Sequence, residues 1–400
     1  MTWISELARQ TPTLAPGAWI PTGSDWGTHP AWLDTSSGAM RSETRFVDVL
    51  VIGAGQAGLA AAHELNRRGM RGFADGTSLA GTYQVLDAEV RPGGAWQHRW
   101  STLTMATVND IADLPGLSVG PHEPDDQASH VIPEYFTRYE EAFDLPIMRP
   151  VFVHSVHRDA GGYLVTTTAG TWQARAIINC TGTWSRPFIP HYPGIHSFAG
   201  LQMHTQDYRG PNQFTRKRVA VVGGGISATQ HLAEIAPVAK STAWFTRREP
   251  QWIESGGKLT SGLDVERSVR ERVEKGLRPL SVVAATGLLV TASVREALAA
   301  GVFKRRPMFT RIEPDGLVQE NGKLWRADSI LWATGFRSEL RHLAPLKLRT
   351  KYGGVMMSGT AVAGEPTLHL LGYGPTASTV GARWGARKAV RELIKVLGID

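Results

Sequence analysis

Two stretches of the chain share one order of hydrophobic and polar positions. Phe46–Ile52 is a run of β-forming residues, apolar except for Asp48, and is typical of a parallel strand that is buried on both faces. Glycines follow, and Leu59–Arg68 then has the composition of a helix. The same order returns with the apolar run Val219–Val222, a second glycine group and a helix from Ile226. The pattern predicts two strand–turn–helix units.

Further elements follow from the same periodicities. A long helix-to-strand insertion, Ala74–Tyr83, is expected at the sheet edge opposite a ligand crevice. One strand is predicted to end at Leu86–Glu89 and another to close on Ala176–Cys180. Two more strands are predicted over Ser241–Thr246 and Ser329–Ala333, and an amphipathic helix over Ala382–Leu397. Residues 1–45 show no period and predict an irregular N-terminal arm.

Composition narrows the class of protein. Hydrophobic residues make up 42% and charged residues 20%, as in a folded globular chain. The net charge is +7, but no block of five Lys or Arg occurs, so we expect anionic small molecules and no nucleic acid as partners. The single cysteine, Cys180, excludes an intramolecular disulfide. No signal peptide or membrane span is predicted, and we expect a cytoplasmic protein.

The first glycine group fits a dinucleotide-binding turn. Gly53, Gly55 and Gly58 form GxGxxG directly after a strand, and Gln56 and Ala57 open the helix. Such glycines permit the turn, let the backbone approach a pyrophosphate and let helix and strand pack closely. The phosphates then lie at the helix N-terminus. At the end of the next strand, Glu89 is placed to accept hydrogen bonds from ribose hydroxyls.

The second glycine group differs in its partner. Gly223, Gly225 and Ala228 repeat the turn, with Ser227 inside it. The following strand ends in Arg247-Arg248, and arginine there suits the 2′-phosphate of NADP by charge and bidentate geometry. Surface arginines without a ligand remain the alternative.

Several further motifs carry a resemblance to a known family. Arg91–Trp96 contains GGxW at Gly93, Gly94 and Trp96. Phe198, Gly200, His204 and Tyr208 match FxGxxxHxxxY in full. Strand-end motifs stand at Cys180-Thr181-Gly182 and Ala333-Thr334-Gly335, and a glycine-rich turn at Gly372–Thr376. In this order the chain resembles the flavin-containing monooxygenase superfamily (class B flavoprotein monooxygenases). Tyr208-Arg209 indicates the N- and S-oxygenating branch and not the Baeyer–Villiger branch.

The resemblance implies an α/β fold with two nested Rossmann-like dinucleotide-binding domains. Residues 46–205 and 336–400 would form a discontinuous FAD domain, and residues 206–335 an inserted NADPH domain. The expected FAD-binding residues are Gly53, Gly55, Gln56, Ala57, Gly58, Glu89, Gly94, Trp96, Val153, Thr181, Gly182, Gly372, Gly374 and Thr376. The expected NADPH-binding residues are His204, Gly223, Gly225, Ser227, Ala228, Arg247, Arg248, Thr334 and Gly335. For His204, a role in holding the linker is equally open.

The implied reaction is NADPH-dependent oxygenation of a small nucleophile at N, S or electron-rich C through a C4a-peroxyflavin, with O₂ as co-substrate. No catalytic side chain and no metal site are predicted. Related enzymes often carry Asn or a basic residue shortly after GGxW, where this chain has Ala106 or Thr107, with Asn109 the nearest amide. This keeps an FAD-dependent NAD(P)H:acceptor oxidoreductase open, and beyond it a non-catalytic nucleotide-binding regulator. Cys180 is interpreted as a core residue, because one thiol cannot form a redox pair.

Overall fold

The structure is a computed structural model that describes residues 44–74, 80–108, 111–254, 262–279 and 287–399. Most of the predicted N-terminal arm and the centre of the insertion at 74–83 lie outside these residues. The described chain divides into two compact units. The larger comprises residues 44–187, 252–289 and 336–399, and the smaller comprises residues 188–251 and 290–335.

A ten-stranded mixed sheet forms the larger unit among the described residues, with the order β18-β19-β20-β7-β1-β3-β2 along its main path. Its parallel centre is β7 (Gly170–Asn179), β1 (Arg45–Ile52) and β3 (Thr82–Leu86), joined by β20 (Glu365–Leu370) and β2 (Arg71–Gly72). The remaining strands are β4 (Ile147–Met148), β5 (Val153–Asp159), β6 (Gly162–Thr167), β18 (Met357–Ser358) and β19 (Ala361–Val362). A separate strand pair is formed by β11 (Trp252–Glu254) and β12 (Leu288–Val290).

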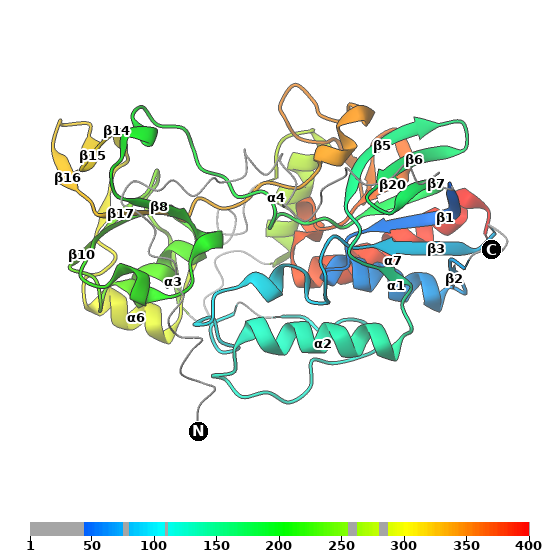
Figure 1. Ribbon diagram of the computed structural model, residues 1–400, viewed down its shortest axis with the longest axis horizontal. Helices are drawn as coiled ribbons and strands as arrows, with labels where there is room; N and C mark the ends of the chain where they lie inside the picture. Colours follow the sequence, from blue (N-terminus) through cyan, green and yellow to red (C-terminus); the bar gives the residue numbers. More distant parts are fainter. Residues whose placement is uncertain (1–43, 75–79, 109–110, 255–261, 280–286, 400) are drawn as a thin grey trace. The chain divides into compact units, whose positions relative to one another are not determined.

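Helices α1 (Gln56–Arg67) and α7 (Thr379–Leu397) pack on one face of this sheet (Figure 1). Small side chains such as Ala60 and Ala389 are fully buried between them, so the helices approach closely. The other helices of the unit are α2 (Ala128–Ala142), α4 (Gly262–Glu274) and the 3₁₀ turns η2 (Gly94–His98), η6 (Arg341–Leu346) and η7 (Gly374–Ala377). None of the described helices combines the length and apolar character that a membrane span requires.

The smaller unit is built on a five-stranded parallel sheet in the order β13-β10-β9-β17-β8. These strands are β8 (Leu201–His204), β9 (Arg218–Val222), β10 (Ser241–Phe245), β13 (Arg305–Arg306) and β17 (Ser329–Trp332). The unit also contains the helices α3 (Ile226–Ile235) and α6 (Ala292–Ala299) and the 3₁₀ turns η3 (Ile195–Ser197), η4 (Thr205–Asp207) and η5 (Pro211–Phe214). A separate antiparallel sheet consists of β14 (Phe309–Glu313), β15 (Gly316–Gln319) and β16 (Leu324–Arg326). The predicted fold class, two nested Rossmann-like units, is confirmed.

Two segments lie in a different unit from the one expected. Residues 188–205 were assigned to the first domain, but β8 hydrogen-bonds to β17 in the sheet of the smaller unit. Residues 252–289 were assigned to the inserted domain, but they belong to the larger unit, where Val273 of α4 packs in its core. Both differences arise from long-range packing that the local pattern does not encode.

Candidate functional site

The first glycine turn connects β1 to α1. Gly53 has φ +99°, and a Cβ there would lie 2.7 Å from the Cys180 carbonyl oxygen. A Cβ on Gly58 would lie 1.9 Å from the Gly53 carbonyl oxygen, so these two positions exclude a side chain. A Cβ on Gly55 would meet nothing within 4 Å. The turn therefore keeps open space in front of the helix at Gly55, as a bound pyrophosphate requires.

The N-terminus of α1 is not capped by a side chain, because Gly55 is the N-cap residue. Gln56 and Ala57 are the first two helical residues, so their amides lie in the first turn. A helix N-terminus of this kind carries unpaired N–H groups and a positive partial charge. The residues present therefore fit a dinucleotide pyrophosphate.

The acid predicted to bind ribose is not the acid that supports the turn. Asp87 is buried, accepts a hydrogen bond from the Ala54 amide at 3.4 Å and pairs with Arg149 at 3.2 Å. Burial raises the pKa of this carboxyl, and Arg149 opposes that shift. Glu89 lies beyond the end of β3 and is half-buried, with Oε1 2.8 Å from His98 Nε2. Glu89 keeps an accessible carboxylate, while Asp87, which the sequence did not single out, holds the turn.

Gly94 and Trp96 begin the short turn η2 beside the glycine turn. A Cβ on Gly94 would lie 3.0 Å from the Gly55 Cα. The GGxW segment therefore closely approaches the first glycine turn and the N-terminus of α1, which together are called the first cradle. Trp96 is half-buried. Val153, by contrast, starts β5 with its side chain in the hydrophobic core, so it has only its backbone to offer a ligand.

The ends of β7 and β20 bring the remaining FAD candidates together. The two strands are parallel neighbours, and a Cβ on Gly372 would lie 3.9 Å from the Gly182 Cα. The Thr181 hydroxyl donates to the Glu339 carbonyl at 2.6 Å, and the Thr376 hydroxyl donates to a carbonyl within its own turn. These hydroxyls shape the loops. Gly374 opens η7, and α7 begins directly after it.

The second glycine turn repeats the geometry of the first. Gly223 has φ +143°, and a Cβ there would lie 2.0 Å from the Ala333 carbonyl oxygen. A Cβ on Gly225, the N-cap of α3, would meet nothing within 4 Å. Ala228 is fully buried where helix and strand pack, and Ser227 lies half-buried in the first helical turn. The smaller unit therefore carries its own nucleotide cradle.

Four arginines lie at the strand ends beside this second cradle. Arg247 and Arg248 follow β10 and are exposed. Arg305 of the neighbouring β13 is already paired with Glu249 at 2.6 Å. Arg306 lies next to it in the same strand, opposite Phe245 of β10. Arg306 was not among the residues predicted from the sequence, although it lies in a run of basic residues at 304–306.

His204 makes the contacts expected of a residue that holds the linker, one of the two roles that the sequence left open for it. Its ring is fully buried, with Nε2 3.0 Å from the Gly335 carbonyl oxygen and Nδ1 accepting the Gln206 amide at 3.2 Å. Burial lowers its pKa to about 4, so the imidazole is neutral. Thr334 likewise uses its hydroxyl on the Phe188 carbonyl, and Gly335 accepts His204. These contacts hold the linker strand and leave no side-chain group for a nucleotide.

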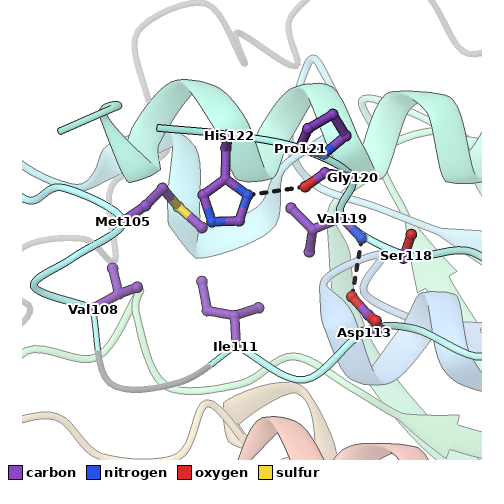
Figure 2. A pocket seen from close by; sticks show the side chains of 9 residues that line it. All are labelled: Met105, Val108, Ile111, Asp113, Ser118, Val119, Gly120, Pro121 and His122. Carbon is purple, nitrogen blue, oxygen red and sulfur yellow. Dashed lines mark hydrogen bonds between the residues drawn. The ribbon is translucent and has the colours of Figure 1, made fainter. Parts of the chain in front are cut away.

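A cavity of about 570 Å³ lies in the larger unit between residues 105 and 122. Figure 2 shows Met105, Val108 and Ile111 around it, with the His122 ring held by the Gly120 carbonyl. The chain beside it connects two helix N-termini, since the Ala112 carbonyl accepts from Gln56 Nε2 and its amide donates to the Thr379 hydroxyl. The chain between Ile111 and Asp113, which line the cavity, is thus bound to the first residues of α1 and α7. Asn109 lies outside the described residues.

Two Rossmann-like units, each with an uncapped helix behind a glycine turn, define a class of oxidoreductases that bind two dinucleotides. The family model described as pyridine nucleotide-disulphide oxidoreductase matches residues 50–356. The chain is 34% identical to the flavin-containing monooxygenase from Stenotrophomonas maltophilia, with a TM-score of 0.73 over 88% of this chain and 100% of that one. It therefore belongs to the pyridine nucleotide-disulphide oxidoreductase family and, within it, to the flavin-containing monooxygenase superfamily.

Two further comparisons also cover most of the chain. Indole-3-pyruvate monooxygenase YUCCA1 of Oryza sativa subsp. japonica is 26% identical over 344 residues, which cover 77% of this chain and 81% of that protein. The NADP⁺-bound cyclohexanone monooxygenase from Rhodococcus sp. Phi1 shares the fold, with a TM-score of 0.59 and 18% identity over 89% of this chain and 85% of that one. The predicted cofactor pair of the superfamily, FAD and NADPH, is confirmed.

The disulphide chemistry in the family's description does not extend to this chain. Cys180 is its one cysteine and is buried beneath the first glycine turn. Burial raises the pKa of its thiol far above the ordinary range, so no thiolate forms. A dithiol relay within the chain is therefore excluded.

Proposed function

We propose that this chain is an NADPH-dependent flavin monooxygenase that transfers one oxygen atom from O₂ to a small nucleophile at nitrogen, sulfur or electron-rich carbon. The second oxygen atom leaves as water, and NADPH supplies the two electrons. The observation that carries the proposal is the pairing of two glycine cradles with opposite strand-end charges, Glu89 beside the first and Arg247-Arg248 beside the second.

In this proposal the larger unit holds FAD. The amides at the start of α1 bind the pyrophosphate, and Glu89 accepts the ribose hydroxyls. The positive end of α7 favours negative charge on the flavin, which supplies the redox chemistry and the activation of oxygen. No side chain of the chain is required as a general acid or base in this scheme.

The smaller unit holds NADPH by the same rule. The first turn of α3 binds the nucleotide phosphates, and the exposed guanidiniums of Arg247 and Arg248 take the 2′-phosphate. The branch assignment rests on Tyr208, whose ring is fully buried against His231 and whose hydroxyl donates to Glu234 at 2.7 Å. We place the reaction in the cytoplasm.

The test is a balance of electrons and oxygen. FAD-loaded enzyme is given NADPH, ¹⁸O₂ and methyl phenyl sulfide, and sulfoxide, hydrogen peroxide and NADPH loss are measured together. We expect one labelled oxygen atom in the sulfoxide for each NADPH consumed. Hydrogen peroxide equal to the NADPH consumed, with no oxygenated product from a panel of amines, sulfides and electron-rich carbons, would overturn the proposal.

One observation favours a second function, an FAD-dependent NAD(P)H:acceptor oxidoreductase. Ala106 carries no polar group, and the Thr107 hydroxyl is bound to its own turn through Thr104. The described residues after η2 thus place no amide where related monooxygenases often have one. Reduction of a quinone or an iron–sulfur protein by NADPH, without oxygenated product, would establish this alternative.

A further inference from the structure

Arg99 is a half-buried cation that has no acidic partner among the residues that the structure describes. Its Nε atom is inaccessible and has no hydrogen-bond partner among the described residues. Burial lowers the pKa of this guanidinium to about 10, and no carboxylate opposes that shift. Arginine is still fully charged at neutral pH under these conditions. Buried charges in proteins are normally paired, so an unpaired guanidinium indicates a missing anion.

Aromatic rings cover the guanidinium. Arg99 Cζ lies 4.4 Å from the ring centre of Trp184 and 5.4 Å from that of Trp96. Trp184 also stacks on Phe336, with ring centres 5.0 Å apart and an interplanar angle of 25°. Aromatic contacts hold a guanidinium by its faces and leave its N–H groups directed outward in its plane. This edge matches a planar carboxylate in bidentate geometry.

Arg99 and the rings of Trp96, Trp184 and Phe336 form a cluster at the edge of the sheet where the parallel strands have their carboxyl ends. Trp96 follows two residues after Gly94, which approaches the first glycine turn to contact distance. Trp184 follows two residues after Gly182, at the carboxyl end of β7. Ligands of parallel α/β sheets bind outside the carboxyl ends of the strands. Arg99 is therefore on the same edge as the FAD cradle.

The acids near Arg99 and its aromatic neighbours contact other side chains and not Arg99. Glu89 binds His98, which itself stacks on Trp184 at 6.3 Å. Glu339 binds Arg341 at 2.6 Å. Neither carboxylate serves Arg99, so the anion must come from a ligand. Cofactor phosphates have their own glycine turns and helix N-termini, whereas the rings around Arg99 suit a ligand with an apolar body.

We propose that Arg99 anchors the carboxylate of the substrate, and that the substrate is a nucleophile carried on an aromatic or apolar body with an acid group. This rests on the proposed monooxygenase function, which it deepens by naming a substrate class. Trp96, Trp184 and Phe336 form the wall against which the apolar body packs. The covalent chemistry is unchanged, since the carboxylate takes no part in oxygen transfer.

Binding tests the proposal without turnover. Oxidised, FAD-loaded enzyme is titrated with (phenylthio)acetate and with methyl phenyl sulfide, and the change in flavin absorbance gives each affinity. We expect the acid to bind at least tenfold more tightly than the neutral sulfide. Arg99→Gln should abolish that preference and leave the sulfide affinity within twofold. Arg99→Lys should keep part of it, while Arg311→Gln, an exposed arginine paired with Glu313, should keep all of it.

Three outcomes would overturn the inference. The first is equal affinity of the wild-type enzyme for acid and sulfide, and the second is an unchanged preference in Arg99→Gln. The third is a loss of FAD affinity in Arg99→Gln with acid binding unchanged, which would assign the anion to a cofactor phosphate. If Arg99→Gln does not fold, the acid preference of the wild type must weaken with salt while sulfide binding does not. A failure of oxygenation alone would leave this binding result intact.

Discussion

Replacing Gly58 or Gly55 of the first glycine turn by alanine should distinguish the requirements of folding from those of FAD binding. Gly58→Ala places a Cβ 1.9 Å from the Gly53 carbonyl oxygen, so helix and strand must part by about 1.1 Å to reach 3.0 Å. We expect a loss of about 1–3 kcal/mol in unfolding free energy, as for overpacked cores. Gly55→Ala meets nothing within 4 Å, and its φ of −78° suits alanine. Its apoprotein should be as stable as wild type or about 0.4–1 kcal/mol more stable.

Gly55→Ala, which leaves the apoprotein stable, should in contrast weaken FAD binding. At Gly55 the new methyl group occupies the space that the pyrophosphate needs, and overpacking of about 1–3 kcal/mol corresponds to a roughly 5- to 150-fold weaker FAD affinity. The assay is FAD titration of apoprotein together with urea unfolding of the same apoprotein. Gly55→Ala that binds FAD as tightly as wild type would refute the placement of the pyrophosphate. Gly58→Ala that unfolds at the wild-type urea concentration would refute the packing argument.

Three further changes test other parts of the chain. Burial lowers the pKa of His342 to about 4. As the pH falls below 6.5, this histidine is protonated in the unfolded chain before it is protonated in the folded one, so its contribution to the unfolding free energy falls by about 2 kcal/mol at pH 5. Urea unfolding at pH 7 and at pH 5 should therefore show a smaller loss of stability in His342→Gln than in the wild type. Cys180→Ala should keep the wild-type rate of anaerobic flavin reduction, and a lost rate would revive thiol chemistry. The double change Arg247→Gln and Arg248→Gln should raise KM for NADPH about 10- to 100-fold through lost charge-assisted hydrogen bonds and leave KM for NADH unchanged, with Arg311→Gln as control.

The parts of the fold that the sequence predicted are those in which a local pattern has one structural solution. An apolar strand followed by GxGxxG fits only a tight turn into a helix, because Gly53 needs a positive φ and Gly58 has no room for a Cβ. The residues whose roles the sequence left open depend on distant contacts. His204 looked like a ligand in its motif, yet its ring nitrogens bind the Gln206 amide and the Gly335 carbonyl. No periodicity reveals such a partner.

The same argument explains why Asp87 was overlooked. Glu89 and Asp87 both follow β3, and the sequence cannot tell which carboxylate turns inward. The structure shows that Asp87 is buried on the turn and Arg149, which lies in a distant segment, neutralises it. A buried pair of this kind needs both partners in place, and their separation along the chain hides the pairing. Glu89 remains accessible to a ligand, because Asp87 is the carboxylate that is buried against the turn.

Specificity within this superfamily must reside outside the two cradles. Both glycine turns obey packing constraints that any dinucleotide would impose, so they cannot distinguish one substrate from another. In the segment between β3 and α2, Gly93 and Gly94 are constrained by close neighbours in the same way, but the described residues after η2 form short turns that carry Arg99 and the cavity near His122. Contacts of Gly94 and Ala112 with Gly55 and Gln56 fix the position of this segment beside the first glycine turn. The substrate of this enzyme should therefore be sought with variants in residues 99–122, and exchange of this segment between relatives should transfer substrate preference with cofactor affinity unchanged.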